Sequence, residues 1–152
     1  MVKKQTLSVK AIKNGTVIDH IPAGEGLNIL HYFKLDQLQK CITVGFNLKS
    51  DTQNHKDLIK IENIFFTEEN IQQIAFFAPN CTINIIQNFQ VIEKITPTYP
   101  DQVIGIFKCP NINCASHTEP VKSHFYVKNK DNKTKLKCHY CEKIYPFEWV
   151  HK

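Results

Sequence analysis

Arginine is absent from this 152-residue sequence: all 19 basic residues are lysine, and the formal net charge is +5. Nucleic-acid interfaces commonly use the forked guanidinium of arginine for bidentate contacts with phosphate and guanine, so its absence counts against a nucleic-acid-binding function. Lysine still binds phosphate well as a point charge. The composition therefore weakens the case for nucleic acid and leaves phosphate binding open.

Long apolar runs are also missing. No segment approaches the roughly 20 apolar residues needed to cross a bilayer, and the first ten residues contain no hydrophobic stretch suited to a signal peptide. We therefore expect a cytoplasmic protein without a membrane partner. In that reducing compartment the 6 cysteines are expected to be metal ligands or buried thiols rather than disulfides.

Catalytic motifs and glycine-rich phosphate loops are absent as well. The 5 glycines form neither a G-x-x-x-x-G-K-[ST] nor a G-x-G-x-x-G pattern. Ser116-His117 and Ser123-His124 are neighbours in sequence only, and adjacency in the chain is not the geometry of a catalytic pair. No catalytic motif therefore stands out, and no residues favour the possibility of an unrelated enzyme with a structural zinc.

The first hundred residues alternate strand-like and helix-like segments. Asn14-Gly15 separates two apolar runs, as in a tight hairpin turn. Thr67 is a suitable helix cap before an apolar stripe at helical spacing, which consists of Ile71, Ile74, Ala75 and Ala78. The expected strands are 7–12, 16–21, 41–48, 58–65, 82–86 and 89–95, and the expected helices are 24–33 and 67–78. Leu27, Leu30 and Phe33 are expected on the buried face of the first helix, and the polar segment 49–56 is expected to be an exposed loop.

Without its first strand, this order begins β-α-β-β-α-β, which is typical of a ferredoxin-like α+β sandwich with both helices on one face of an antiparallel sheet, and the strand 89–95 follows. The segment 96–100 contains two prolines and predicts a linker, after which the composition turns to cysteine, lysine and histidine. We therefore predict two domains, residues 1–100 and 101–152.

The second domain contains two short cysteine pairs. Cys109 and Cys114 form C-x4-C, Cys138 and Cys141 form C-x2-C, and 23 residues separate the pairs. This spacing predicts one tetrahedral Zn²⁺ site, because each tight turn offers two thiolates. Four protein thiolates leave no position for water or substrate, so the zinc is expected to stabilise a domain too small for a large core. A rubredoxin-type iron site with the same ligands remains the alternative.

The other cysteines and the nearby histidines are predicted to lie outside the metal site. Cys41 and Cys81 occupy apolar strand contexts and are expected to be buried. His117, His124 and His139 are expected at the surface, because four thiolates already complete the coordination.

The segment between the cysteine pairs predicts a β-ribbon. Residues 123–127 and 134–137 are expected to be strands joined by the polar turn 129–132, which makes the second domain all-β and zinc-ribbon-like. Lysines at 122, 128, 130, 133, 135 and 137 could form a basic surface, and the alternative function is therefore a zinc-ribbon nucleic-acid-binding protein. Asp131 and the intervening asparagine and threonine residues dilute this charge and favour a solvated hairpin.

Strand alternation predicts a polar face on the N-terminal sheet. If Ile59, Ile61 and Ile83 face the helices, Lys60 and Asn84 face the opposite side. The same face is expected to receive Ile86 and Lys94, with Asp19 and His20 nearby. Ammonium groups beside amide, carboxylate and imidazole groups suit a nucleoside triphosphate. Exposed strand faces are routinely polar, so this pattern alone leaves a solvated face as the alternative.

Ordered blocks along nearly the whole chain carry a more specific signal. They are AIK at 11–13, GTVIDHIP at 15–22, KDLIKIEN at 56–63, CPN at 109–111, SH at 116–117, EPV at 119–121, LKC at 136–138 and YCEK at 140–143. With these blocks the chain resembles the regulatory chain of aspartate carbamoyltransferase. Lys10 and Phe89 depart from the family pattern, which has an acidic residue and a tyrosine at these positions.

The resemblance implies a non-catalytic subunit that controls pyrimidine biosynthesis. Its first domain would bind ATP or CTP, its zinc domain would dock on the catalytic chain, and homodimers of regulatory chains would bridge catalytic trimers in a hetero-oligomer. The implied nucleotide site consists of Val9, Ala11, Ile12, Asp19, His20, Lys60, Asn84, Ile86, Val91 and Lys94. The implied contacts with the catalytic chain are Asn111, Asn113, Glu142 and Lys143.

Overall fold

The computed structural model describes residues 11–52, 54–130 and 133–150. The chain divides into two compact units, Met1–Thr98 and Tyr99–Lys152. The division falls within the proline-containing segment 96–100, which is neither helix nor strand. Among the described residues, no helix is both long enough and apolar enough to cross a membrane.

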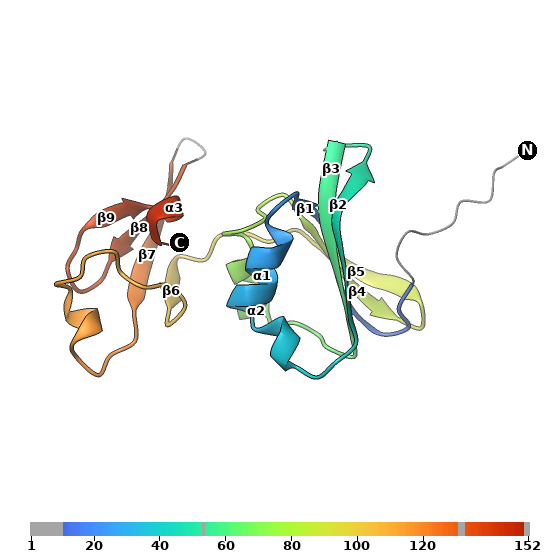
Figure 1. Cartoon of the computed structure of the whole chain (residues 1–152), viewed down its shortest axis with the longest axis horizontal. Coiled ribbons are helices and arrows are strands. Elements are labelled where there is room, and N and C mark those ends of the chain that lie inside the picture. Colours follow the sequence, from blue (N-terminus) through green and yellow to red (C-terminus); the bar gives the residue numbers. More distant parts are fainter. Residues whose placement is uncertain (1–10, 53, 131–132, 151–152) are drawn as a thin grey trace, which may run out of the picture. The chain divides into compact units, whose positions relative to one another are not determined.

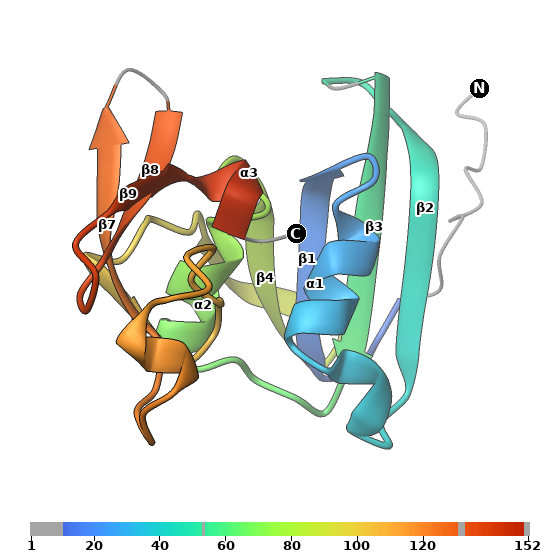
Figure 2. The ribbon, with the colours of Figure 1, turned by 60° about the vertical axis from the view of Figure 1, so that its left-hand side comes forward.

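The first unit is an antiparallel five-stranded sheet with two helices on one face (Figure 1). Its strands are β1 (Gly15–Pro22), β2 (Ile42–Ser50), β3 (Asn54–Glu62), β4 (Thr82–Gln87) and β5 (Gln90–Ile95), and its helices are α1 (Gly26–Tyr32), the 3-10 turn η1 (Leu35–Gln37) and α2 (Glu68–Ile74). The strand order is β2-β3-β1-β4-β5. Figure 2 shows α1 and α2 on the same side of this sheet. The predicted ferredoxin-like sandwich is confirmed, with β5 added at one edge.

The core of the first unit lies between the helices and the sheet. Ile18, Ile59, Ile61 and Ile83 are fully buried on the helix-facing side, as the period-two alternation predicted. Ile74 of α2 is fully buried as well. No described helix of this unit covers the opposite face of the sheet. Lys60 and the other even-numbered neighbours of Ile59 and Ile61 lie on that face.

The start of β1 differs from the predicted hairpin. The predicted strand 7–12 lies largely outside the described residues, and residues 11 and 12 are not in a strand. Gly15 has φ +144°, and a Cβ atom there would lie 2.0 Å from the backbone oxygen of Ile61. This close approach to β3 requires a glycine, independently of any hairpin turn.

The predicted buried face of α1 is partly wrong. Leu27 is 63% exposed, whereas Gly26 and Ile29 are buried. The three-residue spacing of Leu27, Leu30 and Phe33 therefore predicted the wrong buried face. The helix is only seven residues long and packs through its first turn, where Gly26 contacts Asp57. Short helices offer too few turns for periodicity to fix their buried face.

The predicted loop 49–56 is also wrong. β2 and β3 continue into this segment as a paired hairpin, in which Lys49 lies opposite His55 and Ser50 lies opposite Asn54. The residues of this extension are polar on both faces, so no apolar alternation marked them as strand. α2, in contrast, is confirmed: the Thr67 hydroxyl accepts a hydrogen bond from the Asn70 N–H at 3.2 Å, and the predicted stripe is buried.

The second unit is a four-stranded antiparallel sheet of order β6-β7-β8-β9. Its elements are β6 (Gln102–Ile104), η2 (Ala115–His117), β7 (His124–Lys130), β8 (Lys133–Cys138), β9 (Ile144–Pro146) and the short helix α3 (Phe147–Val150). Phe125 and Leu136 are fully buried between the strands. The zinc-ribbon-like fold is confirmed, although β6, β9 and α3 were not predicted because each is only three or four residues long.

Candidate metal centre and ligand cavity

Four cysteines from two turns of the second unit converge on one point. Cys109 follows β6, Cys114 is the N-cap of η2, Cys138 ends β8, and Cys141 lies in the turn before β9. Their sulfur atoms all lie within 4.8 Å of one another. The backbone holds the second turn closed, because the Glu142 N–H donates to the Cys138 carbonyl and the Cys138 N–H donates to the Lys143 carbonyl.

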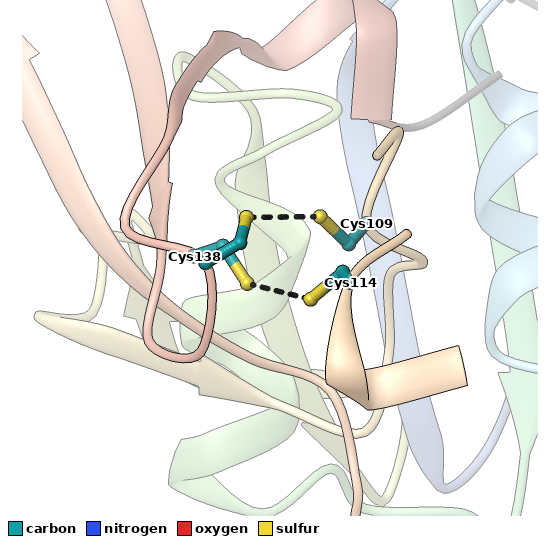
Figure 3. A group of neighbouring side chains, drawn as sticks. Cys109, Cys114 and Cys138 are labelled. Atoms are coloured by element: carbon teal, nitrogen blue, oxygen red, sulfur yellow. Dashed lines mark hydrogen bonds between the residues drawn. The ribbon is translucent and has the colours of Figure 1, made fainter. Parts of the chain in front are cut away.

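The sulfur positions fit a tetrahedral metal ion. The Sγ atoms of Cys109 and Cys141 are 3.7 Å apart, and those of Cys114 and Cys138 are 3.6 Å apart. Figure 3 shows these sulfur atoms facing one another across the two turns. A tetrahedron with metal–sulfur bonds of about 2.3 Å has sulfur–sulfur edges of about 3.8 Å. The four thiolates therefore form a closed metal site with no position for a substrate.

Simultaneous ionisation of all four thiols requires a nearby cation. Burial, together with the neighbouring thiols, raises the pKa of Cys109 to about 12. Burial also opposes ionisation of Cys114, but hydrogen bonds from Ser116 and with the neighbouring cysteines together outweigh it and lower the pKa of Cys114 to about 6. Four thiolates this close together repel one another unless a metal ion compensates their charge.

Polar groups around the cysteines support the sulfur atoms. The Ser116 hydroxyl donates to the Cys114 sulfur at 3.2 Å. Burial raises the pKa of Tyr145, and the sulfurs of Cys109 and Cys141, with which its hydroxyl is hydrogen-bonded, raise it further. Such contacts orient metal-binding thiolates and reduce their excess charge.

The histidines stay outside the cysteine cluster. Among the described residues, the four cysteines are the only group of metal-binding side chains that the structure brings together. His117 Nε2 lies 2.8 Å from the Cys109 carbonyl oxygen, and His124 and His139 stack on each other with their ring centroids 4.6 Å apart.

The two remaining cysteines differ. Cys81 is fully buried, and burial raises its pKa to about 12. The prediction that Cys41 is buried is wrong: this residue is exposed, because it lies just before the edge strand β2.

The predicted contacts with a catalytic chain all lie in the two cysteine turns. Asn113, Glu142 and Lys143 are exposed, and Asn111 is half-buried. The Asn111 carbonyl Oδ1 accepts a hydrogen bond from the Asn113 N–H at 3.1 Å, and its side chain also bonds the Cys141 sulfur. Asn111 thus links the metal site to the surface of its turn.

The helix-free face of the first sheet contains a cavity of about 520 Å³. Seven of the residues named as a nucleotide site line it, namely Ala11, Ile12, Asp19, Lys60, Asn84, Ile86 and Val91. Its floor is a small apolar cluster of Ile12, Val17, Leu58 and Ile86, against which Leu48 packs. The cavity thus combines an apolar floor with charged and amide groups.

The polar groups of the cavity are arranged around one ion pair. Lys56 Nζ lies 2.8 Å from Asp19 Oδ1. Burial lowers the pKa of Lys60, and the nearby Asp19 carboxylate opposes this shift. The side-chain oxygen of Asn84 is buried without a hydrogen-bond partner among the described residues. This acceptor is available to a donor group of a bound molecule.

Two described residues of the predicted nucleotide site, Lys94 and His20, are not among the residues that line the cavity. Lys94 lies directly opposite Asn84 on β5, and therefore on the same face of the sheet. His20 occupies a bulge of β1 with φ 59°, next to the lining residue Asp19. Val9, like the family departure Lys10, lies outside the described residues.

Other lining residues were not predicted. They are Val17, Leu48, Lys49, Lys56, Leu58 and Phe89. Strand alternation contained the signal for Val17 and Leu58, which share the parity of Asp19 and Lys60, whereas Lys56 lies in the segment that was predicted to be a loop. Leu48 and Lys49 lie at the end of the predicted strand and in the predicted loop, so the sequence offered no comparable signal for them.

Lysines gather on one face of the β7–β8 ribbon in the second unit. Lys128 lies directly opposite Lys135, and Lys130 lies opposite Lys133. All four line a groove of about 710 Å³ with Val127, Asn129 and Ile144. Like charges placed directly opposite destabilise a strand pair slightly, and these side chains are exposed to solvent.

These features define a two-unit α+β chain, with a cavity on an open sheet face in one unit and a four-thiolate metal centre in the other. Residues 7–98 match the family described as aspartate carbamoyltransferase regulatory chain, allosteric domain, and residues 101–151 match that described as its metal binding domain. The chain therefore belongs to the family of aspartate carbamoyltransferase regulatory chains, which are non-catalytic subunits.

Similar proteins from three bacteria agree with this assignment. Aspartate carbamoyltransferase regulatory chains from Chromobacterium violaceum and Neisseria gonorrhoeae are 56% and 54% identical to this chain, over 92% and 95% of both sequences. The regulatory chain from Photobacterium profundum is 49% identical over 99% of this chain and 97% of its own length. The similarity thus extends across both units.

Proposed function

We propose that this chain binds ATP and CTP in the ligand cavity of its first unit and transmits their effect to the catalytic chain of aspartate carbamoyltransferase. The cavity is the observation that carries the proposal. It combines an apolar floor, the lysines 49, 56 and 60 and the unpartnered oxygen of Asn84 in a unit that matches the allosteric domain of the family.

The cavity chemistry suits a nucleoside triphosphate. Ammonium groups of Lys60 and of Lys94, which lies on the same sheet face, would meet the phosphates. The buried Asn84 oxygen would accept a hydrogen bond from an N–H of the base or an O–H of the ribose. The apolar floor would contact the flat base. ATP and CTP would therefore compete for this site.

The metal in the second unit is proposed to be Zn²⁺. The two sulfur–sulfur distances of 3.7 and 3.6 Å match the edge length of a tetrahedral zinc–thiolate site, and a closed thiolate set suits a zinc ion with a folding role. Cys109, Cys114, Cys138 and Cys141 would hold the ion. When bound, it would supply charge compensation and cross-linking of the two turns, and no catalysis.

The assembly is proposed to follow the family. Homodimers of this chain would bridge catalytic trimers in a cytoplasmic hetero-oligomer, with Asn111, Asn113, Glu142 and Lys143 contacting the catalytic chain from the two cysteine turns. Nucleotide binding would bias a two-state equilibrium of this assembly. A nucleotide that binds both states with equal affinity would have no effect on activity.

Reconstitution tests the proposal. The purified chain is mixed with catalytic trimers of aspartate carbamoyltransferase, and carbamoylation of aspartate is followed with and without ATP or CTP. We expect assembly and a nucleotide-dependent change of the aspartate saturation curve. Lys60→Ala and Lys94→Ala should weaken nucleotide binding in calorimetry, whereas the exposed Lys40→Ala should not. Unchanged assembly and kinetics, or full affinity in both cavity variants, would contradict the proposal.

Nucleic acid is not included in the proposal. The lysine-lined groove of the β7–β8 ribbon is the feature that would support it. A nucleic-acid function predicts salt-dependent binding of DNA or RNA at physiological ionic strength, which Lys128→Ala and Lys135→Ala should weaken. Retained binding of this kind by the assembled complex would revive that alternative.

A further inference from the structure

Two β-bulges shape the end of the sheet next to the ligand cavity. In β1, Ile18 pairs with Ile59 and Ile21 pairs with Asp57, so Asp19 and His20 share one partner position on β3. In β2, Gly45 pairs with Leu58 and Leu48 pairs with Lys56. Phe46 and Asn47 therefore both lie opposite Asp57. Without this second bulge, Asn47 rather than Leu48 would face the cavity beside Lys56.

Asp57 of β3 lies beside both bulges, because it pairs with Ile21 just after the β1 bulge and lies opposite the two bulge residues of β2. It is 1% exposed, on the face of β3 opposite the cavity. Its Oδ1 accepts a hydrogen bond from the N–H of Asn47, the extra residue of the β2 bulge, at 2.8 Å. Its Oδ2 accepts hydrogen bonds from the N–H groups of Gly24 and Gly26, each at 2.9 Å. One buried carboxylate thus satisfies three backbone donors that neither the sheet nor α1 satisfies.

The neighbours of Asp57 along β3 face the other way. Lys56, which pairs with Asp19, and Leu58 both line the cavity. Across the sheet, the bulge that Asp57 holds turns Leu48 toward the cavity beside Lys56, and the next residue, Lys49, also lines the cavity rim. The carboxylate therefore fixes the backbone from which one whole side of the cavity is built, although it contributes no atom to the cavity lining.

We propose that Asp57 is a positioning residue for the ligand cavity. It acts through the β2 bulge on the cavity rim formed by Leu48 and Lys49, and it ties this rim to the start of α1. The inference rests on the proposed nucleotide binding. A nucleotide that moves the rim would also move the first turn of α1, because the two oxygens of one carboxylate hold both segments. An amide at this position has a single acceptor oxygen and presents an NH2 donor to backbone donors, so it would release one of the two segments.

The test compares ATP and CTP affinities of the full-length metal-loaded chain by calorimetry. Asp57→Asn should weaken both affinities about tenfold while the bound metal is retained. Gly26→Ala is a second route to the same effect, because its new Cβ would lie 2.9 Å from Asp57 Oδ2 and displace the carboxylate. The matched control is Thr16→Val, which removes another buried hydrogen bond on the same sheet face, that of the Thr16 hydroxyl to the Ile64 carbonyl, remote from both bulges. Its affinities should stay within about twofold of wild type.

A double-mutant cycle separates positioning from loss of stability. In a Leu48→Ala/Lys49→Ala background the rim side chains are gone, so Asp57→Asn should weaken ATP binding by less than about threefold. Additive losses, an equal loss in Thr16→Val, or wild-type affinity in both Asp57→Asn and Gly26→Ala would each overturn the inference while the proposed function stands. A wild-type chain that binds neither ATP nor CTP would overturn both.

Discussion

Lys56 reaches across the bulge of β1 to Asp19, with 2.8 Å between Nζ and Oδ1, and both side chains remain about one-fifth exposed to the cavity side. A partly exposed pair of this kind contributes little to stability, about 1 kcal/mol or less. Its significance lies in charge: the pair places a cation at the cavity while masking the carboxylate that would repel a triphosphate.

Lys56→Ala is accordingly expected to weaken ATP binding by about tenfold or more. The change removes a charge-assisted hydrogen-bond donor, worth about 1.5–3 kcal/mol, and leaves the Asp19 carboxylate uncompensated beside the phosphates. Calorimetry of single variants and of Lys56→Ala/Asp19→Ala checks this reasoning, because the double variant should recover part of the loss. Equal affinities of Lys56→Ala and the double variant would show that Asp19 does not repel the ligand.

The pH dependence of nucleotide affinity should follow the ionisation of the Lys60 ammonium group. Burial lowers the pKa of this ammonium group, with Asp19 opposing. Its positive charge is present below the pKa and lost above it, so a lowered pKa moves the loss of affinity to a lower pH than an ordinary lysine would show. ATP affinity measured between neutral and alkaline pH should fall in wild type. In Lys60→Arg, whose guanidinium stays charged, the fall should be shallower.

Local sequence patterns predicted the sheet faces well. Ile59 and Ile61 face the helices and Lys60 faces the cavity because strand alternation depends only on the neighbouring residues. The cysteine spacing likewise predicted the metal cluster, since two short turns hold their own ligands.

Features that depend on distant contacts were not predictable in this way. The β2 bulge exists because Asp57 accepts a hydrogen bond from Asn47, ten positions earlier in the chain, and this bulge decides that Leu48 lines the cavity. The buried face of α1 is likewise set by Gly26 against the same carboxylate. A buried polar side chain that joins three segments leaves no periodic signature, so the sequence could indicate the cavity's chemistry but not its rim.

Gly15→Ala should destabilise the first unit by about 3 kcal/mol or more. A Cβ at φ +144° would lie 2.0 Å from the Ile61 carbonyl oxygen, so β1 and β3 would have to separate. Gly24→Ala is the matched control, because Gly24 also has a positive φ, +99°, but has no atom within 4 Å of its ideal Cβ. Urea unfolding of the metal-loaded chain should show a clearly smaller loss for Gly24→Ala. Similar losses would mean that backbone conformation, rather than the clash, dominates.

Removal of the metal should unfold the second unit and leave the first folded. The second unit has a small core, centred on Phe125 and Leu136, and a bound ion would join its two cysteine turns. After treatment with a strong chelator, NMR amide signals of residues 102–150 should collapse to unfolded positions while those of β1 to β5 persist. The buried thiols of Cys109, Cys114 and Cys138 should then react with a thiol reagent. A folded second unit without metal would contradict the structural role of the site.

Ser116→Ala should lower the affinity for the metal although no metal ligand is removed. The Ser116 hydroxyl donates to the Cys114 sulfur at 3.2 Å and stabilises its thiolate, and loss of such a supporting contact typically reduces metal affinity about 10- to 100-fold. Competition with a chromogenic chelator measures that affinity, and the charge-transfer absorption of the Co²⁺-substituted chain should shift because the thiolate loses a donor. Ser123→Ala is the control, since the described bond of Ser123 is made by its backbone carbonyl to Gly105. If both serine variants bind the metal with wild-type affinity, the hydroxyl contact contributes nothing to the site.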